Sequence, residues 1–208
     1  MQYPAVQPYL FLIHIIIVLK TMLRFSDLKS FSDADRSAVI RYVWELYTTS
    51  FPAEERRSYD NFLRTVLSDP SCSLFLIGER DVAEEAKGFI ISWTLSPELS
   101  FIEHFAIAPE WRNRNIGQTA IEMMTALALS SDSCVLLEAE PPLTEIARRR
   151  IGFYERAGFE IIDADYTQPP YEEDGRGVPL YLMAYNKGEI DAKSATKLLY
   201  GTVYNCPR

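Results

Sequence analysis

Residues 105–118 constrain the fold of this chain more than any other stretch of its sequence. Residues 101–108 form an apolar segment with the pattern of a strand, and residues 116–128 place apolar side chains at helical spacing. Residues 134–139 are again almost continuously apolar, which is typical of a strand buried on both faces. A strand, a helix and a second strand in this order predict a crossover that joins two parallel strands.

The loop between the first strand and the helix has the properties of an anion-binding site. It carries Arg112 and Arg114, and Gly117 lies in the first turn of the expected helix. Unpaired backbone N–H groups and the positive end of the helix dipole both favour an anion at this position. The alternative is a surface turn whose arginines pair with nearby glutamates. The flanking strand and helix favour the phosphate site.

The remaining patterns predict an α+β fold, in an α/β three-layer arrangement. The expected strands are residues 23–28, 73–79, 88–95, 101–108, 134–139, 159–164 and 178–185, and the expected helices are 33–49, 59–67, 116–128 and 143–156, with a further helix after residue 186. This order predicts a mixed, mostly antiparallel sheet of six to seven strands with helices on both faces.

The length of 208 residues fits one domain, which we assign to residues 22–208. We interpret residues 1–21 as an N-terminal extension or a mis-assigned start, and an additional edge strand is the alternative. The apolar run 10–19 is too short to span a bilayer. No Lys or Arg precedes it, which disfavours a secretory signal.

The charge balance limits the classes of ligand. The chain has 29 acidic and 21 basic residues and a net charge of −8, which disfavours binding of nucleic acid or of an anionic membrane. It favours a cationic small molecule or a basic peptide. Three widely spaced cysteines and two histidines offer neither a disulfide framework nor a metal site. They suit the reducing cytoplasm.

Two segments make the chain resemble the GNAT superfamily of acyl-CoA-dependent N-acyltransferases. In the first, Arg112, Asn115 and Gly117 stand where the family has Arg or Gln, a first glycine and a second glycine. The second is Phe-Tyr-Glu-Arg-Ala-Gly-Phe at residues 153–159, similar to the family's Tyr-Glu-Lys-x-Gly-Phe segment. The resemblance covers residues 23–186 in the order of elements.

The resemblance implies an N-acetyltransferase that moves an acetyl group from acetyl-CoA to a primary amine by direct attack. The acceptor is a small-molecule amine or the amine of a peptide or protein, and a homodimer stays open. The cofactor would lie in the splay between the fourth and fifth strands. The residues expected to bind it are Phe105, Ala106, Ile107, Arg112, Asn113, Arg114, Asn115, Ile116, Gly117 and Gln118. No metal is implied.

The same resemblance implies catalytic roles for Tyr154 and Glu103. Tyr154 is the expected acid that protonates the leaving thiolate of coenzyme A. Glu103 is the first choice for the base that receives the proton of the amine, and Glu138 and Glu140 are its rivals. Strand alternation puts these two rivals on one face, and it puts His104 on the face opposite Glu103.

The loop 165–177 borders the acceptor site in the resembling family. Its Tyr166 and Tyr171, together with Glu138 and Glu140, would contact a cationic substrate. A solvated hairpin loop is the alternative interpretation of this segment.

Asn115 departs from the family pattern, since a glycine is usual there. Asn tolerates a positive φ better than most residues, so we expect the cofactor site to be kept. A non-catalytic acyl-CoA-binding or regulatory module on the same fold is the alternative that this departure leaves open.

Overall fold

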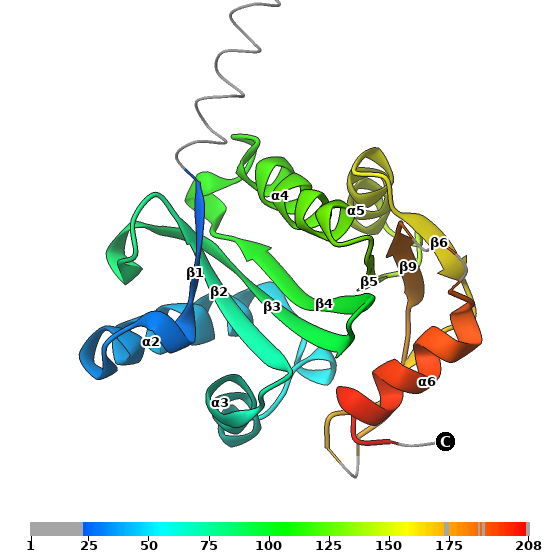
Figure 1. Ribbon diagram of the computed structural model, residues 1–208, viewed down its shortest axis with the longest axis horizontal. Helices are drawn as coiled ribbons and strands as arrows, with labels where there is room; N and C mark the ends of the chain where they lie inside the picture. The colour runs from blue at the N-terminus through cyan, green and yellow to red at the C-terminus, as the bar shows by residue number, and fades with distance from the viewer. Residues whose placement is uncertain (1–22, 173–174, 187, 189, 207–208) are drawn as a thin grey trace, which may run out of the picture.

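The computed structural model describes residues 23–172, 175–186, 188 and 190–206 (Figure 1). The expected extension at residues 1–21 lies outside them. The strands are β1 (Arg24–Asp27), β2 (Cys72–Gly78), β3 (Ala86–Ser96), β4 (Leu99–Ile107), β5 (Cys134–Ala139), β6 (Glu160–Asp163), β7 (Thr167–Gln168), β8 (Val178–Pro179) and β9 (Tyr181–Tyr185). The helices are α2 (Asp33–Ser50), α3 (Tyr59–Ser68), α4 (Ile116–Ser130), α5 (Glu145–Arg156) and α6 (Ala192–Thr202).

Seven strands form one mixed sheet in the order β1-β2-β3-β4-β5-β9-β6. The pair β4 and β5 is parallel, and every other neighbouring pair in this sheet is antiparallel. Helices α4 and α5 cover one face, while α2, α3 and α6 lie on the other (Figure 1). The predicted fold class and the crossover through α4 are confirmed.

Each face of the sheet has its own hydrophobic core, as alternation along buried strands requires. On β4, Phe101 and Ala106 belong to the core under α2, α3 and α6, whereas Ile102 belongs to the core under α4 and α5. Gly158, with a φ of 92°, follows α5 and supplies the predicted helix end.

The parallel strands β4 and β5 separate partway along their length. Their pairing runs from Leu99 with Cys134 to Ile102 with Leu137 and then stops. Beyond it, β4 continues against β3, and β5 continues against β9. The main-chain groups of β4 that face β5 are therefore without a strand partner beyond Ile102, and the sheet opens where the sequence predicts the cofactor.

A β-bulge changes the expected alternation at the centre of β4. Ile91 pairs with His104 and the next residue, Ser92, pairs with Ile102, so Glu103 is the additional residue. Both Glu103 and His104 consequently face the α2 side, where the His104 ring contacts Tyr47 at 4.7 Å between ring centroids. The prediction that these two side chains point to opposite faces is wrong, because it assumed an unbroken strand.

The last expected strand is also divided. Val178–Pro179 pairs with Thr167–Gln168 in a small separate sheet, and only Tyr181–Tyr185 joins the main sheet. Pro179 has no N–H to donate to a continuous ladder. Leu180 N instead donates to Tyr166 O at 3.0 Å, and Tyr166 OH donates to Glu138 on β5, so Tyr166 lies beside β5 and the start of β9. Within the described ranges, no helix is long and apolar enough to cross a membrane.

Candidate active site

The loop before α4 adopts the backbone that the sequence motif predicts. Asn113 and Asn115 have φ values of 58° and 60°, in the left-handed region that favours Gly and Asn. Asn115 is the N-cap of α4, its side chain makes no capping bond, and its carbonyl accepts the first helical bond from Thr119 at 2.9 Å. Asn115 thus adopts the left-handed backbone that a glycine at this position would allow.

A cleft of about 860 Å³ lies against this helix start, and we call it the loop cleft. Its walls are Phe105, Ile107, Trp111, Arg112, Asn113, Asn115, Gly117, Gln118, Arg150, Phe153, Tyr154 and Arg156. Three of these residues are arginines and none is acidic, so the cleft suits a polyanion. A Cβ on Gly117 would lie 3.5 Å from Ile107 and 3.8 Å from Phe105 and Phe153, so the glycine keeps this wall open.

The loop cleft includes most, but not all, of the expected cofactor residues. The Ile116 side chain is buried in the core under α4, so only its backbone can face a ligand. The Arg114 guanidinium lies over the Trp111 ring at 5.0 Å and is not part of the cleft wall. Ala106 lines the neighbouring cavity.

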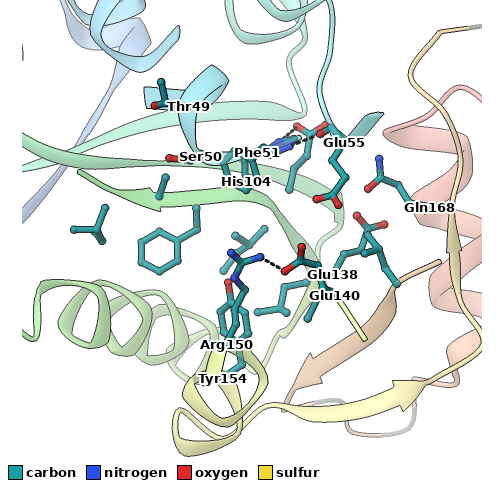
Figure 2. Close-up of a pocket in the computed structure, with 18 of the residues that line it drawn as sticks. Thr49, Ser50, Phe51, Glu55, His104, Glu138, Glu140, Arg150, Tyr154 and Gln168 are labelled. Atoms are coloured by element: carbon teal, nitrogen blue, oxygen red, sulfur yellow. Dashed lines mark hydrogen bonds and ion pairs between the residues drawn. The ribbon is translucent and has the colours of Figure 1, made fainter. Parts of the chain in front are cut away.

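A second cavity, of about 350 Å³, occupies the opening between β4 and β5, and we call it the acceptor cavity (Figure 2). It is lined by Thr49, Ser50, Phe51, Glu55, Ile102, Glu103, His104, Phe105, Ala106, Ile107, Arg112, Leu137, Glu138, Ala139, Glu140, Arg150, Tyr154, Gln168 and Leu180. It shares Phe105, Ile107, Arg112, Arg150 and Tyr154 with the loop cleft. A ligand lying along the loop cleft can therefore reach the cavity past Tyr154.

Tyr154 lies on α5 in the wall common to both spaces and is 8% exposed. Its ring packs against Phe153 and Phe159, at 5.2 and 5.9 Å between centroids. Burial raises the pKa of Tyr154, and the nearby Arg150 opposes this shift. The hydroxyl is therefore protonated at neutral pH, as a proton donor must be.

Glu103, the first choice for the base, is bound on all sides. Arg57 donates to its Oε1 from Nη2 at 2.7 Å and from Nε at 3.1 Å. Tyr171 OH donates to the same oxygen at 2.9 Å, and Trp93 Nε1 donates to Oε2 at 2.8 Å. A carboxylate has about four acceptor positions, so this one is saturated.

The environment of Glu103 makes it a poor base. Burial alone would raise its pKa, but the Arg57 guanidinium and the donors around the carboxylate hold the pKa well below its usual range. The role of Glu103 as base stays a prediction, and the contacts around it favour its rival Glu138. The sequence could not reveal this, because Arg57 is 46 positions away and belongs to no motif.

Glu138, one of the two rivals, has the opposite environment. Burial raises its pKa to about 8, against the two tyrosine hydroxyls that lower it, and Glu103 and Glu55 raise it further. Tyr166 donates to Oε1, and Tyr204 donates to Oε1 and Oε2 at 3.0 and 2.9 Å. Each hydroxyl has one hydrogen, so the two tyrosines occupy two of the carboxylate's about four acceptor positions.

The two tyrosines expected at the acceptor site lie behind its wall. Neither Tyr166 nor Tyr171 lines the acceptor cavity. Tyr166 donates to Glu138, and Tyr171 donates to Glu103 while its ring lies 4.5 Å from the Arg57 guanidinium. The structure therefore replaces their expected substrate contact with a supporting role for the two glutamates.

Glu138 and Glu140 both line the acceptor cavity, as their alternation predicts. Glu140 accepts from Arg150 Nη1 at 2.6 Å (Figure 2). Glu55, from the segment between α2 and α3, also faces the cavity (Figure 2). Sequence reasoning missed Glu55 because no periodicity or motif marks that segment.

Three buried polar atoms in this cavity lack hydrogen-bond partners. They are Ser50 Oγ, His104 Nδ1 and Gln168 Nε2. His104 and Gln168 are only 4% and 3% exposed. Because buried polar groups are normally paired, these three residues are candidates for contacts to a polar ligand.

Comparison with known proteins assigns this fold and site to a family. The family model for the acetyltransferase (GNAT) family matches residues 38–159. A structure from Bacteroides thetaiotaomicron, described as an acetyltransferase assigned to the GNAT family, is 31% identical over 87% of this chain and 98% of its own, with a TM-score of 0.73. The chain belongs to the GNAT family of acetyltransferases, whose members use acetyl-CoA.

More distant structures share the fold. The ribosomal-protein-S18-alanine N-acetyltransferase of Escherichia coli is 17% identical over 79% of this chain and 93% of its own, with a TM-score of 0.53. A spermidine N-acetyltransferase of Vibrio cholerae, in complex with CoA and spermine, is 13% identical over 79% of this chain and 95% of its own, with a TM-score of 0.55. Comparison with curated protein sequences gave no match.

Proposed function

We propose that this acetyltransferase acetylates a primary amine by direct attack, with the acceptor bound in the acceptor cavity. The observation that carries the proposal is the position of Tyr154 in the wall between that cavity and the loop cleft. An amine on one side and a cofactor on the other would meet there. Holding both reactants in one place supplies much of the rate.

The loop cleft fits acetyl-CoA. Arg112 and the uncapped N–H groups at the start of α4 would hold its pyrophosphate, and Gly117 keeps the wall open. Backbone groups of β4 near Ala106 and Ile107 would hold the rest of the cofactor, since β5 has diverged from them. Bound acetyl-CoA supplies an acetyl group activated as a thioester.

Glu138 is the proposed base. An alkyl ammonium has a pKa of about 10.4, so the acceptor must lose a proton before it can attack. A carboxylate with a pKa of about 8 accepts a proton near neutral pH far better than an ordinary one. The ammonium group first gives one proton to Glu138. The N–C bond then forms and the C–S bond breaks, Tyr154 gives its proton to the departing sulfur, and the second proton that the nitrogen loses replaces the proton of Tyr154.

A cytoplasmic location belongs to the same proposal. Cys72, Cys134 and Cys206 are free thiols, two of them buried. Free thiols suit a reducing compartment.

Release of free thiol from acetyl-CoA, followed over a panel of primary amines, tests the proposed function. The expected result is amine-dependent release with stoichiometric N-acetylated product in the mass spectrum. Calorimetry with acetyl-CoA and coenzyme A measures cofactor binding independently. Binding of the cofactor without turnover of any amine would contradict the assignment.

A further inference from the structure

The acceptor cavity is lined by four glutamates and by two arginines, Arg112 and Arg150. Its walls contain the carboxylates of Glu55, Glu103, Glu138 and Glu140. Arg57 neutralises Glu103 at 2.7 Å, and Arg150 neutralises Glu140 at 2.6 Å. Among the described residues, neither Glu55 nor Glu138 has an ion-pair partner, so two carboxylates are left for a ligand.

These two carboxylates interact with one another and with the other acids of the cavity. Burial raises the pKa of Glu55, as it does that of Glu138, and Glu140 raises it further. Glu55 in turn raises the pKa of Glu138, which places both within electrostatic reach. A cation bound between them would remove this repulsion.

One of the unpartnered buried atoms, His104 Nδ1, belongs to a residue of the same wall. His104 Nε2 lies 3.0 Å from the carbonyl oxygen of Glu55, and a carbonyl can only accept. Nε2 therefore carries a hydrogen that it donates to this carbonyl. Nδ1 is 3.9 Å from Glu103 Oε2, beyond hydrogen-bond range, and has no hydrogen-bond partner among the described residues.

From these observations we infer that the acceptor is a small amine with two cationic groups. One group reacts between Glu138 and Tyr154, and the other stays protonated and is held by Glu55. The inference rests on the proposed function and adds the substrate class. A cavity of about 350 Å³ suits a compact diamine.

The test compares 1,4-diaminobutane with n-butylamine, which has the same four-carbon chain and one amine. In the unmodified protein, kcat/KM for the diamine is expected to exceed that for the monoamine by at least about tenfold, the effect of one partly buried charged hydrogen bond. In Glu55→Gln this ratio should fall to about twofold or less. Glu54→Gln, which changes the exposed neighbour outside the cavity, should keep the original ratio.

Failure of the inference is distinct from failure of the proposed function. Equal kcat/KM values for the two amines, or a ratio that Glu55→Gln leaves unchanged, would overturn the dicationic acceptor and leave acetyl transfer in place. If no amine is acetylated, the proposed function fails, and calorimetric titration of both amines decides the inference. Preferential, Glu55-dependent binding of the diamine would support it, and equal or absent binding would overturn it.

Discussion

Arg57 and Glu103 form a buried ion pair in which two nitrogens of the guanidinium, Nε and Nη2, donate to the same carboxylate oxygen at 3.1 and 2.7 Å. Nη2 also donates to Val203 O at 3.0 Å. The pair thus joins the segment before α3, the bulge of β4 and the residue that follows α6. This is a structural junction beside the acceptor cavity.

We expect Glu103→Gln to lower the free energy of unfolding by about 3–5 kcal/mol, since it leaves the buried Arg57 charge uncompensated. The folded pKa of Glu103 lies below the unfolded value of about 4.3. Its contribution is therefore present above that value and is lost as the pH falls below it. Urea unfolding at pH 7 and pH 3.5 measures both effects. The control is Glu84→Gln, which changes an exposed glutamate. If Glu103→Gln lowers the free energy of unfolding by less than about 1 kcal/mol at pH 7, the ion pair does not have this structural role.

Glu138→Gln should remove the pH dependence that the base imposes on catalysis. A base works when deprotonated, so kcat/KM of the unmodified protein is expected to rise with pH and level off above a pKa of about 8. The variant should lose about 10²–10⁴ in rate together with this rise. Glu140→Gln, which changes the residue just after β5 that pairs with Arg150, should change KM and retain the profile. If kcat/KM of Glu138→Gln still rises with pH and levels off near pH 8, another residue is the base.

The same substitution should stabilise the folded protein at high pH. The folded pKa of Glu138 is raised above the unfolded value, so its favourable contribution exists below about pH 4.3 and is lost as the pH rises through about 8. At pH 8.5, Glu138→Gln should raise the Tm on the order of 5 °C, because 1 kcal/mol shifts a domain of this size by roughly 2–4 °C. At pH 4 the two proteins should melt together. A variant less stable at pH 8.5 would contradict the raised pKa.

Tyr154→Phe tests the acid. Turnover should fall roughly ten- to a thousandfold, because the departing sulfur loses its proton donor. The Kd for acetyl-CoA measured by calorimetry should stay within about twofold, since the ring and its packing remain. Tyr59→Phe alters a tyrosine that is 45% exposed and should change neither quantity. Unchanged turnover in Tyr154→Phe would exclude the role.

Gly117→Ala tests whether Gly117 is required for cofactor binding and not for stability of the fold. The added Cβ meets protein atoms only at 3.5 Å and beyond, which is ordinary contact. Ala also favours the helix over Gly by about 1 kcal/mol, so thermal stability should be equal or higher. The methyl group projects at the loop cleft, and we expect the Kd for acetyl-CoA to rise about tenfold. An unchanged Kd would remove Gly117 from the cofactor site.

Local pattern was sufficient where neighbours in sequence are also neighbours in space. The strand, loop and helix of residues 105–118, the left-handed backbone at Asn115 and the helix end at Gly158 all follow from short-range rules. The parallel pair β4 and β5 follows from the order of elements. Tyr154 was placed by its motif, and the structure puts it in the wall between the two cavities.

Only the tertiary structure shows how differently two candidate glutamates are bound. Glu103 and Glu138 are both buried carboxylates, yet one pairs with Arg57 and the other is bound by the hydroxyls of Tyr166 and Tyr204. These partners lie 46, 28 and 66 positions away, and no local pattern relates them. The pKa of a buried group depends on its contacts in space. The sequence therefore identified both glutamates as candidates, and the fold determined the direction in which the pKa of each is shifted.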